Sequence, residues 1–141
     1  MNDKAIVLDA NILIRAVLGT RVREIILSNE STVRFLSPDA AFADARKYLP
    51  QLLKKRGLVI DEGMKSLALY EQQFIEILEQ DFYGPLQHQS LLRIGARDPN
   101  DWPVLACAIR IGCPVWTEDA DFFGTGIATW TTDRVELYFS E

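Results

Sequence analysis

The sequence predicts an α/β fold in which a mainly parallel β-sheet lies between helices. Short apolar segments alternate with longer ones whose apolar residues recur at helical spacing. Residues 5–8 show no polar alternation, which is typical of a central strand buried on both faces. Because the sequence has no internal repeat, low-complexity segment or interdomain linker, we expect residues 1–141 to form a single domain in a three-layer sandwich.

The composition narrows the class of protein. Hydrophobic residues make up 48% of the chain and charged residues 25%, which is ordinary for a soluble globular protein. No apolar run approaches the roughly 20 residues of a membrane span, and the N-terminus lacks a signal-peptide pattern, so we expect a cytoplasmic protein without a membrane partner. Cys107 and Cys113 are expected to be buried thiols. The formal charge of −5 argues against a broad basic face for nucleic acid, but not against cleavage of nucleic acid through bound cations.

Start and stop signals define the expected elements. The expected strands are residues 5–8, 32–36, 113–117, 127–130 and, at an edge, 135–139. The expected helices are residues 12–18, 22–27, 38–56, 61–79 and 98–111. Asn11 is expected to cap the first helix, whereas Ser37 as N-cap and Pro38 at the first position open the third. Pro50 is expected to bend or split that third helix. Residues 81–89, with the lone His88, carry no clear pattern.

Four aspartates lie at the ends of these elements. Asp9 ends the first strand, Asp119 follows the strand at 113–117, Asp101 opens the helix before it, and Asp44 lies at the margin of an apolar helical stripe. Because the carboxyl ends of parallel strands lie at one edge of a sheet, Asp9 and Asp119 are neighbours if their strands are adjacent.

Each acid also has a purely structural interpretation. Asp98 is a plausible N-cap with Asp101 as its capping-box partner, Asp44 a solvated helix residue, and Asp119 and Asp121 turn formers. The combination is more informative than any single acid, because converging carboxylates need raised pKa values or a cation. Oxygen ligands without histidine or cysteine clusters favour Mg²⁺ or Mn²⁺.

These residues resemble those of the PIN domain family, the metal-dependent ribonuclease fold of VapC-type bacterial toxins. The resemblance covers nearly the whole chain and is most specific at residues 7–11 and 98–122. It implies a five-stranded parallel sheet, hydrolysis of RNA by a Mg²⁺- or Mn²⁺-activated water, a homodimer and an antitoxin partner. Residues 58–89 carry little family signal and are expected to set partner or substrate preference.

The resemblance also implies roles for individual residues. The implied metal ligands are Asp9, Asp101, Asp119 and Asp121, and the implied catalytic acids are Asp9, Asp44, Asp101 and Asp119. Asp44 stands where the family usually has a glutamate, so its shorter side chain is expected to act through a water. Asn11 and Thr117 match polar positions that orient the acids, and Asp98 is an auxiliary cap. Arg15, Arg46 and Arg97 are candidates to meet phosphates.

Other classes of function fit less well or remain open. An aspartyl-phosphate phosphatase would have an aspartate at the position of Asn11, and a receiver domain would have a late lysine, whereas no lysine follows Lys65. A catalytically degenerate PIN domain that binds RNA or protein without cutting stays open, and the short acid at Asp44 is its best support.

Overall fold

The computed structural model describes residues 4–95 and 97–141 and has a five-stranded sheet at its centre. The strands are β1 (Lys4–Leu8), β2 (Val33–Pro38), β3 (Ile75–Leu78), β4 (Val115–Trp116) and β5 (Thr129–Trp130). Their order is β3-β2-β1-β4-β5, and every pairing is parallel. This arrangement confirms the predicted α/β fold and places β1 beside β4.

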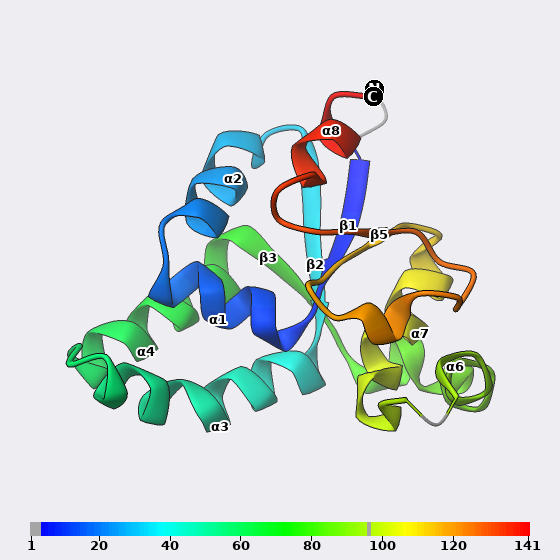
Figure 1. The fold of residues 1–141 in the computed structure, drawn as a ribbon, viewed down its shortest axis with the longest axis horizontal. Coiled ribbons are helices and arrows are strands. Elements are labelled where there is room, and N and C mark those ends of the chain that lie inside the picture. The colour runs from blue at the N-terminus through cyan, green and yellow to red at the C-terminus, as the bar shows by residue number, and fades with distance from the viewer. Residues whose placement is uncertain (1–3, 96) are drawn as a thin grey trace.

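Helices cover both faces of the sheet (Figure 1). They are α1 (Ala10–Leu18), α2 (Arg21–Asn29), α3 (Asp39–Lys55), α4 (Ile60–Leu69), α5 (Gln80–Tyr83), α6 (Gln87–Ile94), α7 (Trp102–Ile111) and α8 (Val135–Phe139). In Figure 1, α1 to α4 lie on one side of the strands, α6 and α7 lie on the other, and α8 lies near the start of β1. Within the described residues, no helix combines the length and the apolar character needed to cross a bilayer.

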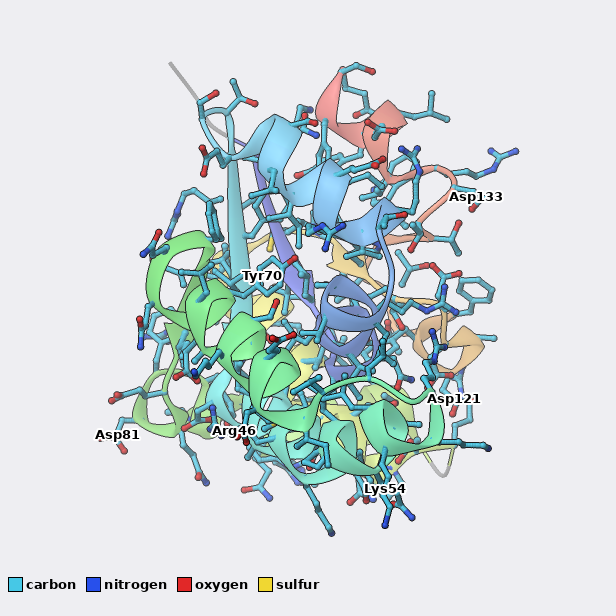
Figure 2. All side chains as sticks on the ribbon, turned by 90° about the vertical axis from the view of Figure 1, so that its left-hand side faces the viewer. Arg46, Lys54, Tyr70, Asp81, Asp121 and Asp133 are labelled. Atoms are coloured by element: carbon cyan, nitrogen blue, oxygen red, sulfur yellow. The ribbon has the colours of Figure 1, made fainter. Side chains whose placement is uncertain are left out.

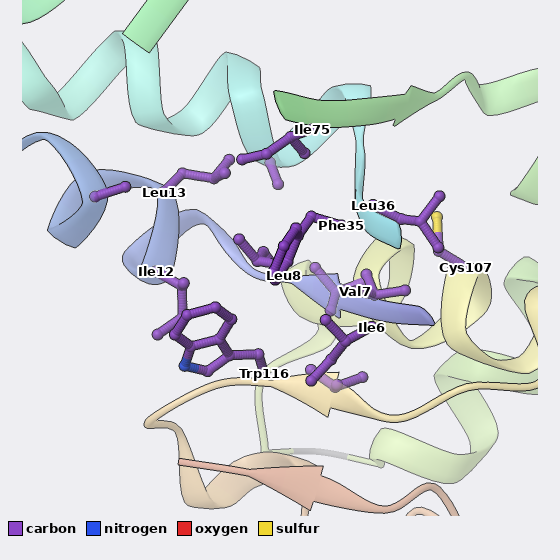
Figure 3. Packing of buried hydrophobic residues seen from close by; sticks show 14 of the residues in the cluster. Ile6, Val7, Leu8, Ile12, Leu13, Phe35, Leu36, Ile75, Cys107 and Trp116 are labelled. Carbon is purple, nitrogen blue, oxygen red and sulfur yellow. The ribbon is translucent and has the colours of Figure 1, made fainter. Parts of the chain in front are cut away.

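The core surrounds β1, whose last three residues are fully buried. Figure 3 shows Leu36 of β2 close to Cys107 of α7 on one side of the sheet, and Trp116 of β4 beside Ile12 of α1 on the other. Cys107 and Cys113 are buried and free, as expected. The absence of polar alternation in β1 therefore reflects burial between two layers of helices.

Two predicted helix caps are wrong. Asp9 rather than Asn11 caps α1, because the helix follows β1 immediately and the Ile12 amide donates to Asp9 Oδ1 at 3.0 Å. Ser37 does not cap α3 but remains in β2, where its hydroxyl donates to the carbonyl of Leu8 at 2.7 Å. Pro38, with extended backbone, takes the cap position of α3.

Pro50, expected to bend or split α3, does not split it, since the helix runs unbroken from Asp39 to Lys55. Buried leucines on both sides of the proline, Leu49 and Leu53, hold the helix in place. Leu53 also meets α4 closely, since a Cβ at Gly63 would lie 2.3 Å from Leu53 Cδ1. Tight packing between α3 and α4 thus offsets the backbone hydrogen bond that proline removes.

The sequence prediction assigned two segments to the wrong kind of element. The expected helix at 61–79 ends in a π-helical turn (Tyr70–Phe74), and Ile75–Leu78 form the edge strand β3, which pairs with β2 and forms an Arg34–Glu76 ion pair at 3.1 Å. The expected edge strand at 135–139 is the helix α8, and its Tyr138 hydroxyl donates to the carbonyl of Ala5 at 2.9 Å. Apolar spacing alone does not separate helix from strand in such short segments.

Residues 81–89, which carried no clear pattern, form the end of α5, a 3₁₀ turn (Gly84–Leu86) and the start of α6. His88 is exposed on α6.

Replacing Ser37 by alanine tests how β2 supports the end of β1. Ser37 is fully buried and donates to Leu8, the residue before Asp9. We expect Ser37→Ala to lower the free energy of unfolding by about 1 kcal/mol, because a buried hydrogen bond is lost. Urea titration followed by circular dichroism measures this change. Ser28→Ala, at an exposed position of α2, is the control and should stay within about 0.5 kcal/mol of wild type. Equal stability of the two variants would contradict the prediction.

Candidate functional site

Asp9 is a buried carboxylate at the carboxyl end of β1. Its side chain is 5% exposed. Oδ1 accepts the Ile12 amide at 3.0 Å, and Oδ2 accepts the Thr117 hydroxyl at 2.5 Å. Burial nevertheless raises the pKa of Asp9 to about 6, and the nearby charges of Asp119 and Glu118 add to this rise. The protein therefore holds this carboxyl group firmly but leaves its negative charge only partly compensated.

Thr117 links Asp9 to residues 118–121, the acidic segment that follows β4. Leu8 pairs with Trp116, so the residues after β1 and β4 leave the sheet side by side. The Thr117 hydroxyl donates to Asp9 and also accepts the amide of Asp119 at 2.9 Å. Asp119 Oδ1 in turn accepts the amide of Asp121 at 2.9 Å. Hydrogen bonds thus set the positions of Asp9, Asp119 and the backbone at Asp121.

Asp101 reaches the same place from the start of α7. Asp98 Oδ1 accepts the Asn100 amide at 3.1 Å and opens the 3₁₀ turn Pro99–Asp101, whereas Asp101 itself makes no capping bond. Asp101 Oδ2 is buried and has no hydrogen-bond partner among the described residues. Burial, followed by the charges of Asp98, Asp119 and Asp9, raises the pKa of Asp101 to about 8. Without a cation this carboxyl group is mostly protonated at neutral pH.

Four acids form the acidic cluster: Asp98, Asp101, Asp119 and Asp121. One carboxylate oxygen from each lies within 4.8 Å of the others. Ligand oxygens around Mg²⁺ with bonds of 2.0–2.1 Å are at most about 4.2 Å apart, so the cluster is only slightly wider than one coordination shell. Together with the unsatisfied Asp101 oxygen, this all-carboxylate set fits a hard divalent cation.

Beside the cluster lies an open pocket of about 220 Å³, the acidic pocket. Its polar lining comes from Asp9, Asn11, Asp44, Tyr48, Asp98, Asn100, Asp101 and Asp119. Asp44 is exposed on α3 and is not part of the acidic cluster, although it faces the same pocket. Asn11 is also exposed at the rim.

The structure brings most of the expected site residues together, but the acidic cluster differs in membership from the expected set of metal ligands. Asp9, Asp101 and Asp119 line one pocket, and Thr117 bridges two of them. Asp98, expected as an auxiliary cap beside the site, is part of the cluster, whereas Asp9 is not. Both oxygens of Asp9 already accept hydrogen bonds from the protein. Direct metal ligation by Asp9 therefore stays a prediction.

Sequence reasoning did not select Tyr48 or Asn100, which also line the pocket. The signal for Tyr48 is its position four residues after Asp44, on the same face of α3. Asn100 lies between Asp98 and Asp101, and only these two acids of that segment were expected at the site.

The three candidate arginines have different surroundings. Arg46 is paired with Glu71 at 2.5 Å, and Arg97 donates to the carbonyl of Phe123. Arg15 is exposed on α1 and lines a separate pocket.

Comparison with solved structures shows the same fold in other proteins. VapBC2 from Rickettsia felis, bound to a DNA fragment from their promoter, matches with a TM-score of 0.63 and 13% identity over 90% of this chain and 98% of that chain. FitAcB from Neisseria gonorrhoeae matches with a TM-score of 0.59 and 21% identity over 90% and 97%. No curated protein matches the sequence.

The family model of the PIN domain matches residues 7–140, a range that includes the six acids of the acidic pocket and the acidic cluster, from Asp9 to Asp121. The end of β1, the strands β2 to β5 and the acids that follow β1 and β4 lie within this range. The chain belongs to the PIN domain family.

Proposed function

We propose that this protein is a Mg²⁺- or Mn²⁺-dependent endoribonuclease that hydrolyses phosphodiester bonds in RNA, and that it is the toxin of a toxin–antitoxin pair. The observation that carries the proposal is the acidic cluster with the buried, unbonded oxygen of Asp101. Carboxylates at this separation repel one another unless they bind protons or a cation. Membership of the PIN family supports nuclease chemistry, and the likeness to VapBC2 supports the toxin role.

In this proposal the chain prepares a place for the cation and for the reacting phosphate. Asp98, Asp101, Asp119 and Asp121 would hold the ion. A bound divalent ion lowers the pKa of water and stabilises the charge of a phosphodiester transition state. Asp101 gives up the proton that its raised pKa retains, and Thr117 keeps Asp119 in register with Asp9. Buried Asp9 adds negative potential that favours the cation.

The partners belong to the same proposal. Exposed residues such as Asn11 and Asp44 line the acidic pocket, so it is accessible from solvent. The RNA substrate, an antitoxin, a homodimer and a cytoplasmic location remain predictions.

A degenerate PIN domain that binds without cutting is the second candidate. The observation that favours it is the exposed position of the short Asp44 outside the acidic cluster. A protein of this kind would bind RNA or a partner protein but show no metal-dependent cleavage.

Asparagine at the acidic positions tests the catalytic proposal. Asp9→Asn and Asp119→Asn keep the shape of the side chains but remove their charge. We expect each to lower the rate of RNA cleavage by on the order of 10²-fold, as for other lost electrostatic groups. A fluorescence assay on labelled single-stranded RNA with Mn²⁺ measures the rate, and circular dichroism checks folding. Asp133→Asn, at an exposed position outside the pocket, is the matched control. Cleavage that continues in excess EDTA would remove the metal mechanism.

The pH dependence of Mn²⁺ binding tests the ligand set. Since Asp101 has a pKa of about 8, Mn²⁺ must displace a proton below that pH. We expect the Kd to fall by up to about tenfold per unit between pH 6 and pH 8 and then to level off. Thermal melting measures this, and Mn²⁺ at ten times the Kd should stabilise by about 1.4 kcal/mol.

The metal-free protein tests the direction in which the raised pKa of Asp101 makes stability depend on pH. A raised carboxyl pKa contributes stability that is complete below about pH 4 and is lost as pH rises through the folded-state pKa. In EDTA, Asp101→Asn should therefore gain stability relative to wild type from about pH 4 to about pH 8. No melting shift with millimolar Mn²⁺ would favour the degenerate domain instead.

Lengthening Asp44 tests whether its reach limits activity. Asp44 faces the pocket but is not part of the cluster, so Asp44→Glu should retain or raise the cleavage rate if a longer acid approaches the ion. Asp44→Asn should lower the rate under the same interpretation. Steady-state cleavage of the same RNA compares the two variants. A large loss in Asp44→Glu would contradict a role as a direct ligand.

A further inference from the structure

A second pocket lies at the corner between α1 and α2 and has the opposite charge to the acidic pocket. Its volume is about 490 Å³. We call it the arginine pocket, after the polar residues that line it: Arg15, Thr20, Arg21, Arg56 and Thr132. These residues come from α1, the start of α2, the end of α3 and the segment after β5. The pocket therefore brings together positive charge from segments distant in the sequence.

Most of this positive charge has no partner in the protein. Arg21 is paired with Glu136 at 2.5 Å. Within residues 4–95 and 97–141, neither Arg15 nor Arg56 has a carboxylate within 4.0 Å or a side-chain hydrogen bond. Two unpaired guanidinium groups that share one pocket, in a chain of formal charge −5, favour an anionic ligand.

The arginine pocket continues the acidic pocket along α1. Asn11 and Ile14 line the acidic pocket, whereas Arg15 and Leu18 line the arginine pocket. Arg15 follows Asn11 by four residues, and Leu18 follows Ile14 by the same number. The same face of α1 therefore lines both pockets, with a displacement of one helical turn, about 6 Å. Figure 2 views the molecule from the side of α1 and α2, with Asp121 and Asp133 on the right-hand edge beside them.

Thr132, which lines the arginine pocket, is hydrogen-bonded to the acidic segment at residues 118–121. The Trp116 indole nitrogen donates to the Thr132 hydroxyl at 3.1 Å, and the Thr132 amide donates to Glu118 at 2.7 Å. Glu118 directly precedes Asp119. A ligand in the arginine pocket therefore lies against a segment whose position is linked to the acidic cluster.

We propose that the arginine pocket is a phosphate-binding subsite for the backbone of a single RNA strand whose reacting phosphate lies in the acidic pocket. This inference rests on the proposed ribonuclease function. Guanidinium groups bind phosphate oxygens in a bidentate manner, and phosphates recur along a strand, so one strand supplies an anion to both pockets. Arg15 and Arg56 hold the backbone and do not take part in bond cleavage.

RNA binding without cleavage tests this subsite. The probe is a fluorescently labelled 12-nucleotide oligouridylate in EDTA, and anisotropy gives the Kd at several salt concentrations. We expect the double variant with Arg15→Ala and Arg56→Ala to bind about tenfold or more weakly. The slope of log K against log salt should decrease in magnitude by about 1.4, since two contacts with single-stranded phosphates are lost.

Matched variants separate charge from folding. Lys55→Ala removes one exposed positive charge next to Arg56 but outside the pocket, and its affinity should stay within twofold of wild type. Arg15→Lys and Arg56→Lys keep the charge and should retain most of the salt slope. Melting temperatures close to wild type, expected for substitutions at these exposed positions, show that the alanine variants are folded.

Several results would overturn the proposal. They are no salt-dependent RNA binding by the wild type, an unchanged slope in the double alanine variant, and arginine-dependent binding of a polyglutamate peptide in place of RNA. The last result would assign the pocket to an acidic protein partner. Binding is measured in EDTA and is therefore independent of cleavage. If the protein binds RNA through these arginines but does not cleave it when Mn²⁺ is added, the ribonuclease proposal is contradicted and the RNA-binding subsite is not.

Discussion

The carboxylate of Asp9 is held at 5% exposure between β1 and α1, and the rest of the acidic site is arranged around this charge. Its two hydrogen bonds use the first turn of α1 and the Thr117 side chain, so a single residue ties a strand, a helix and the neighbouring strand end together. Burial still raises its pKa to about 6. The fold therefore keeps a partly uncompensated charge at the sheet edge, which is a common feature of sites that bind a ligand.

Two neighbouring pockets on the molecule carry opposite charges. The acidic pocket gathers carboxylates, and in the arginine pocket Arg15 and Arg56 have no ion-pair partner among the described residues, whereas Arg21 is paired with Glu136. The Arg15 and Asn11 positions on α1 show that the two regions are one turn apart. A protein with a formal charge of −5 thus has a local positive region one helical turn away from its acidic pocket. Net charge alone is a poor guide to such a surface.

The sequence was sufficient to predict the parts of the site that follow from parallel pairing. Asp9 and Asp119 follow strands whose apolar residues are evident in the sequence, which predicts that the two acids are neighbours if these strands are adjacent. The structure supplies the adjacency of β1 and β4. The edge strand β3 was missed because Phe74, Ile77 and Leu78 also fit a helical stripe. The helix α8 was missed because contacts with residues far away in the sequence, among them Ala5 and Phe35, favour helix over strand. Tertiary packing decides such short segments, and no local pattern contains that information.

The position of Asp98 depends on loop geometry in the same way. Its side chain opens the turn at Pro99, and this turn brings both Asp98 and Asp101 to the edge where Asp119 and Asp121 lie. The acidic cluster therefore obtains its fourth carboxylate from the segment before α7, whereas Asp44 on α3 stays exposed at the rim. A short acid at position 44 is compatible with a complete cluster, because the charge that it fails to deliver is already present on Asp98. The shortened side chain is consequently weak evidence for a degenerate site.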